Sequence, residues 1–192
     1  MRHEETRQQI LRAAWEQMRV EGVASLSLRA LARTVGMEPQ SLYSYFESKY
    51  AIYDALFAEA STEFLERLRA AAAEGDGNAD PIEGVRRRAH VWVRFCTEDP
   101  VRYQLLFQRT IPGFEPSEAS YAIARETLAD ARRMLARAGL GTDRHLDMYT
   151  AVLAGLVAQQ LANDPGGRRY VRHLDEVLDM YLDHMNKQRK GR

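Results

Sequence analysis

Residues 27–49 read SLRALARTVGMEPQSLYSYFESK and predict two short helices joined by a tight turn. Ser27 is a suitable N-cap for a helix over residues 28–34, because its hydroxyl can accept a hydrogen bond from a first-turn amide. Gly36 follows that helix and allows a turn with positive φ. Pro39 suits the first position of a second helix, since its φ is fixed and it lacks an N–H. The pattern is that of a helix-turn-helix, whose second helix fits a major groove.

The second short helix is predicted to have an inward and an outward face. Leu42 and Phe46 are four residues apart and are expected to be buried. The outward face carries polar groups on Gln40, Ser41, Tyr43, Ser44 and Tyr45. A preceding helix over about residues 4–20 is predicted to complete a three-helix core. Its apolar residues are Ile10, Ala14 and Met18 at a spacing of four, with Leu11 and Trp15 alongside.

These residues resemble the DNA-binding domain of the TetR (tetracycline-repressor) family of transcriptional regulators. The positions that match in order and spacing are Leu31-Ala32, Val35-Gly36, Ser41-Leu42-Tyr43, Tyr45-Phe46 and Ser48-Lys49. The similarity extends from about Thr6 to Leu56. The chain departs from many relatives at Glu38 and Pro39, where they carry a small polar cap and a basic or glycine residue. Beyond about residue 60 the chain resembles the family only in being all helical.

The resemblance implies a role for each residue of the outward face. It assigns phosphate contacts to Tyr43, Tyr45 and Lys49, with Ser27 and Arg29 as further candidates at the first short helix. Base reading falls to Gln40 and Ser41, because a glutamine amide can pair with both N6 and N7 of adenine. Glu38 is a weaker candidate for reading cytosine N4. The alternative for the two tyrosines is partial packing against the first helix.

Composition predicts a folded cytoplasmic protein. The chain has 192 residues, of which 45% are hydrophobic, and its formal net charge is zero. It has no apolar run long enough to span a membrane, and its first residues contain no signal-peptide core. The single cysteine, Cys96, excludes an intrachain disulfide and is expected to be a small buried residue. We expect a DNA-binding domain over residues 1–50 and a ligand-binding and dimerisation domain over residues 51–192.

Helical periodicity continues to the end of the chain and predicts an all-α fold. The glycine-rich and acidic stretch of residues 74–80 is expected to be a loop. The residues that recur on one face of the helix after Ser117 are Tyr121, Ala124, Leu128, Ala131, Leu135 and Ala138. The expected helices beyond residue 48 cover about residues 49–73, 81–97, 100–107, 117–138, 143–162 and 167–187.

The last two predicted helices have wide apolar stripes. These stripes could bury against a second copy as a four-helix bundle, which the resemblance also implies, or they could close the core of a single chain. The expected homodimer interface consists of Leu153, Leu156, Val157, Gln160, Tyr170, Leu174, Val177, Leu178 and Tyr181.

The middle helices are expected to surround a pocket for a small, largely apolar effector. Its lining is a mixture of aromatic, methionine and amide side chains, each of which could instead fill the core. The candidates are Trp92, Phe95, Tyr103, Phe107, Tyr121, Met134, Met148, Tyr149 and Gln159.

Enzymatic and metal-dependent functions find little support. The sequence has no GxSxG, glycine-rich phosphate loop or HExxH motif, and no two histidines are four residues apart. A metal site at His90 and Cys96 is the strongest idea of this kind, and we expect no metal or cofactor. Arg86-Arg87-Arg88 is expected to be solvated charge. We therefore expect a homodimeric repressor that binds a palindromic DNA operator and is released by its effector. The alternatives are a ligand-independent DNA-binding protein and a small helical enzyme.

Overall fold

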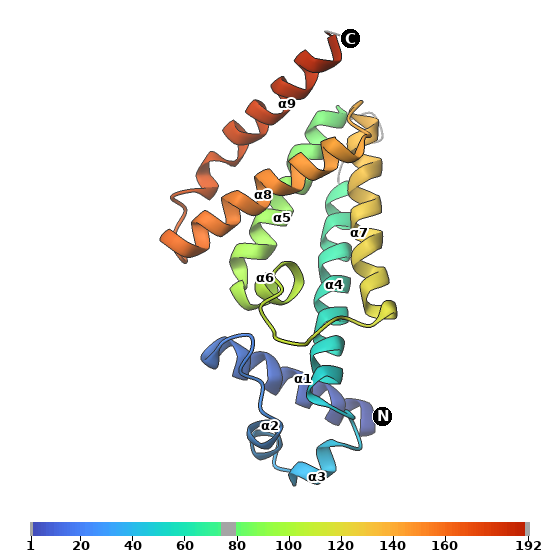
Figure 1. Cartoon of the computed structure of the whole chain (residues 1–192), viewed down its shortest axis with the longest axis vertical. Helices are drawn as coiled ribbons and strands as arrows, with labels where there is room; N and C mark the ends of the chain where they lie inside the picture. The colour runs from blue at the N-terminus through green and yellow to red at the C-terminus, as the bar shows by residue number, and fades with distance from the viewer. Residues whose placement is uncertain (1, 74–79, 191–192) are drawn as a thin grey trace. The chain divides into compact units, whose positions relative to one another are not determined.

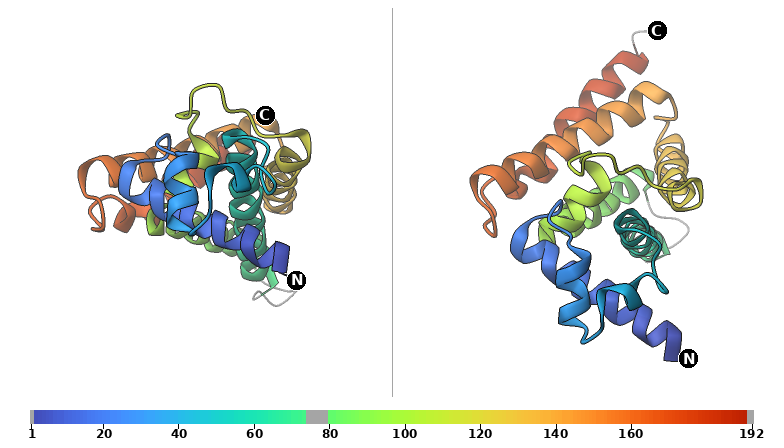
Figure 2. Two further views of the ribbon diagram at one scale, coloured as in Figure 1. Left: turned by 90° about the horizontal axis from the view of Figure 1, so that it is seen from below. Right: turned by 60° about the horizontal axis from the view of Figure 1, so that its bottom comes forward.

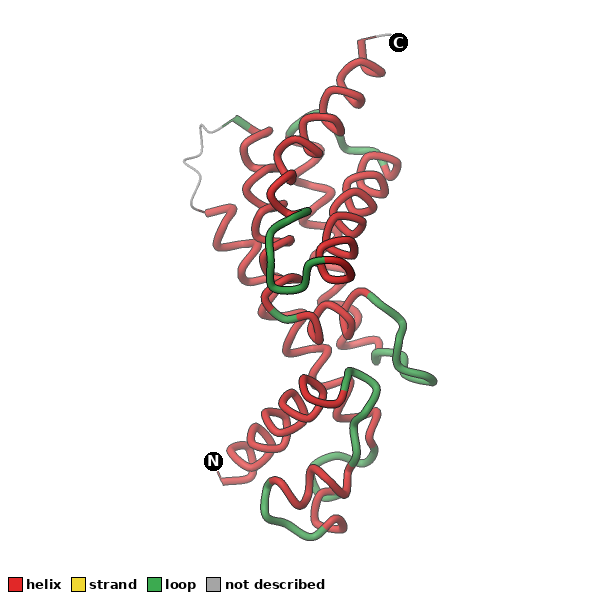
Figure 3. The backbone as a smooth tube through the Cα atoms, turned by 90° about the vertical axis from the view of Figure 1, so that its left-hand side faces the viewer, coloured by secondary structure: helices red, strands yellow, loops and turns green. Residues whose placement is uncertain are grey.

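A computed structural model describes residues 2–73 and 80–190, and every regular element in these ranges is a helix (Figure 3). The prediction of an all-α fold is confirmed. None of these helices combines the length and the apolar character that a membrane span requires. The loop predicted before Asp80 lies outside the described residues. The elements are α1 (Arg2–Glu21), α2 (Leu28–Thr34), α3 (Pro39–Leu42), α4 (Lys49–Ala73), α5 (Pro81–Glu98), α6 (Pro100–Phe107), α7 (Glu118–Arg137), α8 (Asp143–Asn163), η1 (Val171–His173) and α9 (Leu174–Lys190) (Figure 1).

The chain forms two compact units, which we describe separately. Unit 1 contains the chain up to Thr62 together with Val101–Ile123, and unit 2 contains Glu63–Pro100 and the chain from Ala124 onward. Helices α4 and α7 therefore each begin in unit 1 and end in unit 2. A functional division of the chain at residue 50 stays a prediction.

The turn between α2 and α3 depends on Gly36. The amide of Gly36 donates to the carbonyl of Arg33 at 3.2 Å, and the amide of Met37 donates to that of Ala32 at 2.9 Å. This is the hydrogen-bond pattern of a Schellman motif, which needs a left-handed residue after the helix. Gly36 supplies it with a φ of +71°. At the other end of α2, the Ser27 hydroxyl accepts from the amide of Ala30 at 3.4 Å, as the sequence predicted.

In unit 1, α2 packs against both α1 and α3. The predicted inward residues Leu42 and Phe46 are buried, and so is Trp15, whose indole N–H donates to Glu59 at 2.9 Å. Tyr53 of α4 is fully buried, and its hydroxyl donates to the carbonyl of Val23 at 2.9 Å while accepting from the amide of Leu26 at 3.3 Å. Burial raises the pKa of this hydroxyl above its ordinary value, so it remains a neutral donor. Tyr53 thus attaches α4 to the α1–α2 loop.

The connection between α6 and α7 is also held to α4. The Asp54 carboxylate accepts from the amide of Ser117 at 2.7 Å and from the hydroxyls of Ser117 and Ser120, each at 2.9 Å. The Tyr50 hydroxyl donates to the carbonyl of Pro112 at 3.0 Å. Phe114 packs against the rings of Tyr50 and Tyr53. These contacts place residues 112–120 in unit 1.

The same contacts correct the predicted face of α7. Tyr121 and Leu128 were expected to point inward, but they are 43% and 45% exposed. Ser120 and Thr127, one position earlier on each turn, are buried instead. The apolar spacing failed here because a polar residue, Ser120, has a carboxylate partner in Asp54 and can therefore be buried.

In unit 2, α5 packs against α8 and α9, which lie side by side (Figure 2). The core of unit 2 includes Val85, Phe95, Leu153 and Leu178, together with Cys96, whose predicted burial is confirmed. Tyr181 fixes α9 to α8, because its hydroxyl donates to the carbonyl of His145 at 2.9 Å.

The last helix begins later than predicted. Residues 167–173 are not α-helical, because polar side chains of the preceding helix end bind their amides. The Gln160 amide oxygen accepts from the amides of Tyr170 and Val171 at 2.9 and 3.2 Å. The Asp164 carboxylate accepts from the amide of Arg169 at 2.8 Å. This bond and the one from Gln160 lower the pKa of Asp164 below its ordinary value. Only the single turn η1 forms before α9 starts at Leu174.

Replacing Gly36 should destabilise the protein through backbone strain alone. An added Cβ at Gly36 would meet no other atom within 4 Å, so sterics with neighbours are not involved. We expect Gly36→Ala to lower the free energy of unfolding by about 1–2 kcal/mol, measured by denaturant titration. The matched control is Gly84→Ala, which also has open space but lies within α5. It should raise the free energy by about 0.5–1 kcal/mol. Equal effects would contradict the strain argument.

Removing the Tyr53 hydroxyl should leave two buried backbone groups, those of Val23 and Leu26, without their partner. We expect Tyr53→Phe to lower the free energy of unfolding by about 1–3 kcal/mol. Tyr50→Phe removes a similar bond at an exposed side chain, where water can replace it. Its expected change is below about 0.5 kcal/mol. A Tyr53→Phe effect as small as that of Tyr50→Phe would refute the role of the buried hydroxyl.

Candidate nucleic-acid interface

Helix α3 presents a polar exposed face over a buried apolar one. Gln40, Ser41, Tyr43 and Ser44 are exposed, and Tyr43 keeps 54% of its surface. Leu42 and Phe46 are buried beneath them. The regular helix ends at Leu42, but the amides of Tyr43, Tyr45 and Phe46 still donate to carbonyls three or four residues earlier, at 3.0–3.3 Å. The helical turn therefore continues far enough to set the direction of both tyrosines.

Two arginines of α2 lie beside the start of α3. Arg29 and Arg33 are exposed, and together with Met37, Glu38 and Pro39 they line a surface crevice of about 390 Å³. Arg29 was among the predicted DNA contacts, whereas Arg33 was not. Their spacing could have predicted that Arg33 lies beside Arg29, because residues four apart share one face of a helix.

Glu38 is exposed at the N-cap position of α3, and its side chain makes no capping hydrogen bond. It lines the same crevice as the two arginines. The crevice therefore carries two guanidinium groups and one carboxylate, and a phosphate that approaches it would meet both kinds of charge.

The side chains of Tyr45 and Lys49 contact neighbouring rings. Tyr45 is half-buried and stacks on His3 of α1, with ring centroids 4.5 Å apart. The Lys49 ammonium lies 5.6 Å from the centroid of Tyr50. The Tyr45 ring therefore packs partly against the first helix, which was the alternative interpretation of this residue. His3 was not selected by sequence analysis, and no spacing rule links it to Tyr45.

The predicted effector residues divide between the two units. Tyr103 is buried in unit 1, and Phe95 and Tyr149 are buried in unit 2, whereas Trp92, Met134 and Met148 are half-buried. The other three candidates, Phe107, Tyr121 and Gln159, are exposed. The Gln159 amide is engaged by Asn163 at 3.0 Å.

Two buried tyrosines of unit 2 lie close together. The rings of Tyr149 and Tyr181 are 6.1 Å apart, and the Tyr149 hydroxyl donates to the carbonyl of Val85 at 3.4 Å. Burial raises the pKa of Tyr149 and raises that of Tyr181 to about 12. Both hydroxyls are therefore neutral donors at physiological pH.

Most predicted interface residues are buried within the single chain. They are Leu153, Val157, Gln160, Leu174, Leu178 and Tyr181, whereas Leu156, Tyr170 and Val177 are half-buried. Gln160 in particular holds the loop before α9, as described above. The six buried residues thus close the core of unit 2, which was the alternative interpretation of these stripes. The homodimer itself stays a prediction.

Within residues 2–73 and 80–190, no three His, Cys, Asp or Glu side chains are grouped as a metal site would require. His90 lies 2.9 Å from Asp175 at the surface, whereas Cys96 is fully buried. Burial raises the pKa of the Cys96 thiol, which disfavours the thiolate that binds metals.

The sequence is similar to known transcriptional regulators. The family model described as "Bacterial regulatory proteins, tetR family" matches residues 10–56, which include α2 and α3. The HTH-type transcriptional regulator Rv1816 of Mycobacterium tuberculosis is 26% identical over 124 residues, covering 63% of this chain and 52% of that protein. YobS of Bacillus subtilis, an uncharacterised HTH-type transcriptional regulator, is 29% identical over 99 residues, covering 52% of this chain and 50% of that protein. The chain thus spans about half the length of these curated relatives.

Solved structures match nearly the whole chain. A chain described as "putative regulatory protein SCO4313" has a TM-score of 0.77 and 28% identity, with 94% of this chain and 97% of that chain covered. FadR of Bacillus subtilis, a transcriptional regulator solved in complex with stearoyl-CoA, has a TM-score of 0.67 and 20% identity, with coverage of 91% and 97%. The second match shows the fold alone.

Proposed function

We propose that the chain, whose residues 10–56 match the tetR family of bacterial regulatory proteins, is a DNA-binding transcriptional repressor that a small molecule releases from its operator. Its fold and relatives are those of transcription regulators and not of enzymes. The operator, the effector and the homodimer are the parts that require experiment.

One observation carries the DNA-binding proposal, namely the exposed polar face of α3 over a buried apolar one. Because Leu42 and Phe46 anchor the turn in the core, the backbone that bears Gln40 and Ser41 is fixed before DNA arrives. Gln40 and Ser41 read base edges in the major groove. Tyr43, Tyr45 and Lys49 contact phosphates, and Ser27 and Arg29 do so from α2.

A homodimer would present two such faces to one duplex. Recognition helices about 34–36 Å apart fit successive major grooves and select a palindrome. Since most of the predicted stripe is internal, the contact surface must come from the outward sides of α8 and α9. Ala151 and Gly155 are exposed on α8, four residues apart, and an added Cβ at Gly155 would meet nothing within 4 Å. Met180 of α9 is 71% exposed. Such small and apolar surface suits close helix contact.

The effector is proposed to bind among the buried aromatic residues of unit 2, near Phe95 and Tyr149. The complex of a FadR with stearoyl-CoA supports the idea that this fold can accept an organic ligand. The effector binds more tightly to the conformation that does not bind the operator. The loss of operator affinity cannot exceed this difference in effector affinity between the two conformations.

The proposed function is tested by selecting bound fragments from a random duplex pool and by sedimentation of the free and DNA-bound protein. A palindromic consensus bound by two chains supports the proposal. Selection of no consensus, or binding of one chain to a non-palindromic site, would contradict it.

Arg29 is expected to act through phosphate alone. Arg29→Gln should weaken binding to operator and to random DNA by the same factor and reduce the slope of log affinity against log salt by about one unit per subunit. Fluorescence anisotropy at several salt concentrations measures both quantities. The control Arg137→Gln removes the same charge from an exposed residue of α7 in unit 2 and should leave the slope unchanged. A selective loss of operator binding in Arg29→Gln would rule out a pure phosphate contact.

Gln40 is expected to choose one base pair. Gln40→Ala should cost about 1–3 kcal/mol on the preferred site and relax the preference at one position of each half-site. Competition with single-base variants of the operator measures this. Ser44→Ala is the matched control, because the exposed Ser44 hydroxyl is already bonded to the carbonyl of Ser41 at 2.7 Å. An unchanged base preference in Gln40→Ala would remove Gln40 from the reading role.

A further inference from the structure

Arg88 of α5 is buried, contrary to the prediction that Arg86-Arg87-Arg88 is solvated. Only 6% of its surface is exposed. Its Nη1 donates a long hydrogen bond to the carbonyl of Leu68 at 3.4 Å. Its Nη2 is buried and has no hydrogen-bond acceptor among the described residues. Arg86, in contrast, reaches the surface and pairs with Asp179.

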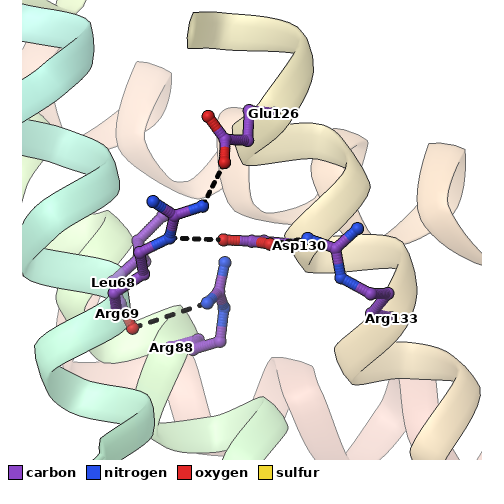
Figure 4. Close-up of polar contacts among 6 residues, drawn as sticks. All are labelled: Leu68, Arg69, Arg88, Glu126, Asp130 and Arg133. Atoms are coloured by element: carbon purple, nitrogen blue, oxygen red, sulfur yellow. Dashed lines mark hydrogen bonds and ion pairs between the residues drawn. The ribbon is translucent and has the colours of Figure 1, made fainter.

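The guanidinium of Arg88 points towards a carboxylate that is already occupied (Figure 4). One oxygen of Asp130 accepts from Nε of Arg69 at 3.1 Å, and the other accepts from Arg133. Glu126 takes the remaining end of Arg69. Among the described residues, three guanidinium groups therefore face two carboxylates, which leaves this cluster with one unbalanced positive charge.

That unbalanced charge is at the innermost position. The side chains of Arg69 and Arg133 are 49% and 61% exposed, so water can solvate them, whereas Arg88 is enclosed. Burial lowers the pKa of Arg88, with Tyr149 and Asp130 opposing the change, but an arginine stays charged in proteins. A buried charge without a carboxylate of its own is costly, and replacement by an apolar residue of similar size is often neutral or stabilising.

We infer that Arg88 is the receptor for a carboxylate group on the effector, an inference that rests on the proposed ligand-released function. A guanidinium binds a carboxylate through two parallel hydrogen bonds. One carboxylate also supplies the single negative charge that balances the cluster. Arg69 and Arg133 lie on the exposed side, where an anion would approach. Next to Arg88 on its own helix, Val85 and Ala89 are buried and apolar, which suits the remainder of an organic acid.

A carboxylate in this position would lie beside cationic groups from three helices. Arg69 belongs to α4, Arg88 to α5 and Arg133 to α7. An acid that binds Arg88 would compete with Asp130 for the neighbouring Arg69 and Arg133. It would therefore change the spacing of α4 and α7, the two helices that continue into unit 1.

The test compares carboxylates with neutral and phosphorylated analogues. Hexanoate, decanoate, benzoate, 1-decanol and decyl phosphate are titrated into the full chain by calorimetry and by thermal shift. The variants are Arg88→Met, which keeps an unbranched apolar stem without the charge, and Arg94→Met, which removes an exposed charge from the same helix. We expect at least one carboxylate to bind the wild type and Arg94→Met equally. Its dissociation constant should rise by at least about tenfold in Arg88→Met.

Arg88→Met should also melt at the same or a higher temperature than the wild type without ligand. A lower melting temperature would mean that Arg88 serves the fold. Equal binding of acid by Arg88→Met, binding of decanol as tight as decanoate, tighter binding of decyl phosphate, or no binding of any acid would each overturn the inference.

Duplex selection with wild type and Arg88→Met in the absence of ligand separates the two proposals. If neither selects a consensus, the proposed function fails. If both select the same consensus and Arg88→Met still responds to the acid as the wild type does, only the role of Arg88 fails.

Discussion

The hydroxyl of Tyr53 is the interaction on which unit 1 depends. It bridges a carbonyl and an amide of the α1–α2 loop from a fully buried position on α4. Since α2 starts two residues after Leu26, this bridge fixes where α2 begins relative to α4. The Schellman turn at Gly36 then fixes where α3 begins relative to α2. The direction of Gln40 and Tyr43 therefore follows from one buried hydroxyl and one glycine, both outside the exposed face.

Helix α4 also fixes a segment that is distant in sequence. Tyr50 and Asp54 lie one turn apart and bind the backbone of residues 112 and 117, with Phe114 between the rings of Tyr50 and Tyr53. Consecutive residues, Tyr53 and Asp54, thus hold two different loops. A movement of the start of α7 must either carry α4 with it or break the three hydrogen bonds to Asp54.

Local sequence rules predicted the helices well, since the determinants are local: the Ser27 cap and the Gly36 turn are both present. The failures have a common cause in long-range polar contacts. Gln160 stops the helix expected from residue 167, and Asp54 permits Ser120 to be buried in place of an apolar residue. At the candidate interface, the outward face of α3 could be predicted, but the stacking of His3 on Tyr45 could not, because it joins distant segments.

The burial of Arg88, in contrast, could have been predicted from the helical periodicity of α5. It lies three residues after Val85 and next to Ala89, on the stripe that buries Val85, Ala89 and Cys96. The run of three arginines suggested a solvated patch, but consecutive helical residues point in different directions, so a run on a helix cannot share one environment. A charge within an apolar stripe is unfavourable for stability unless a partner balances it. The described chain provides Asp130, which two other arginines already occupy. We therefore explain the buried Arg88 by ligand binding. Function is the usual reason for keeping a residue that costs stability.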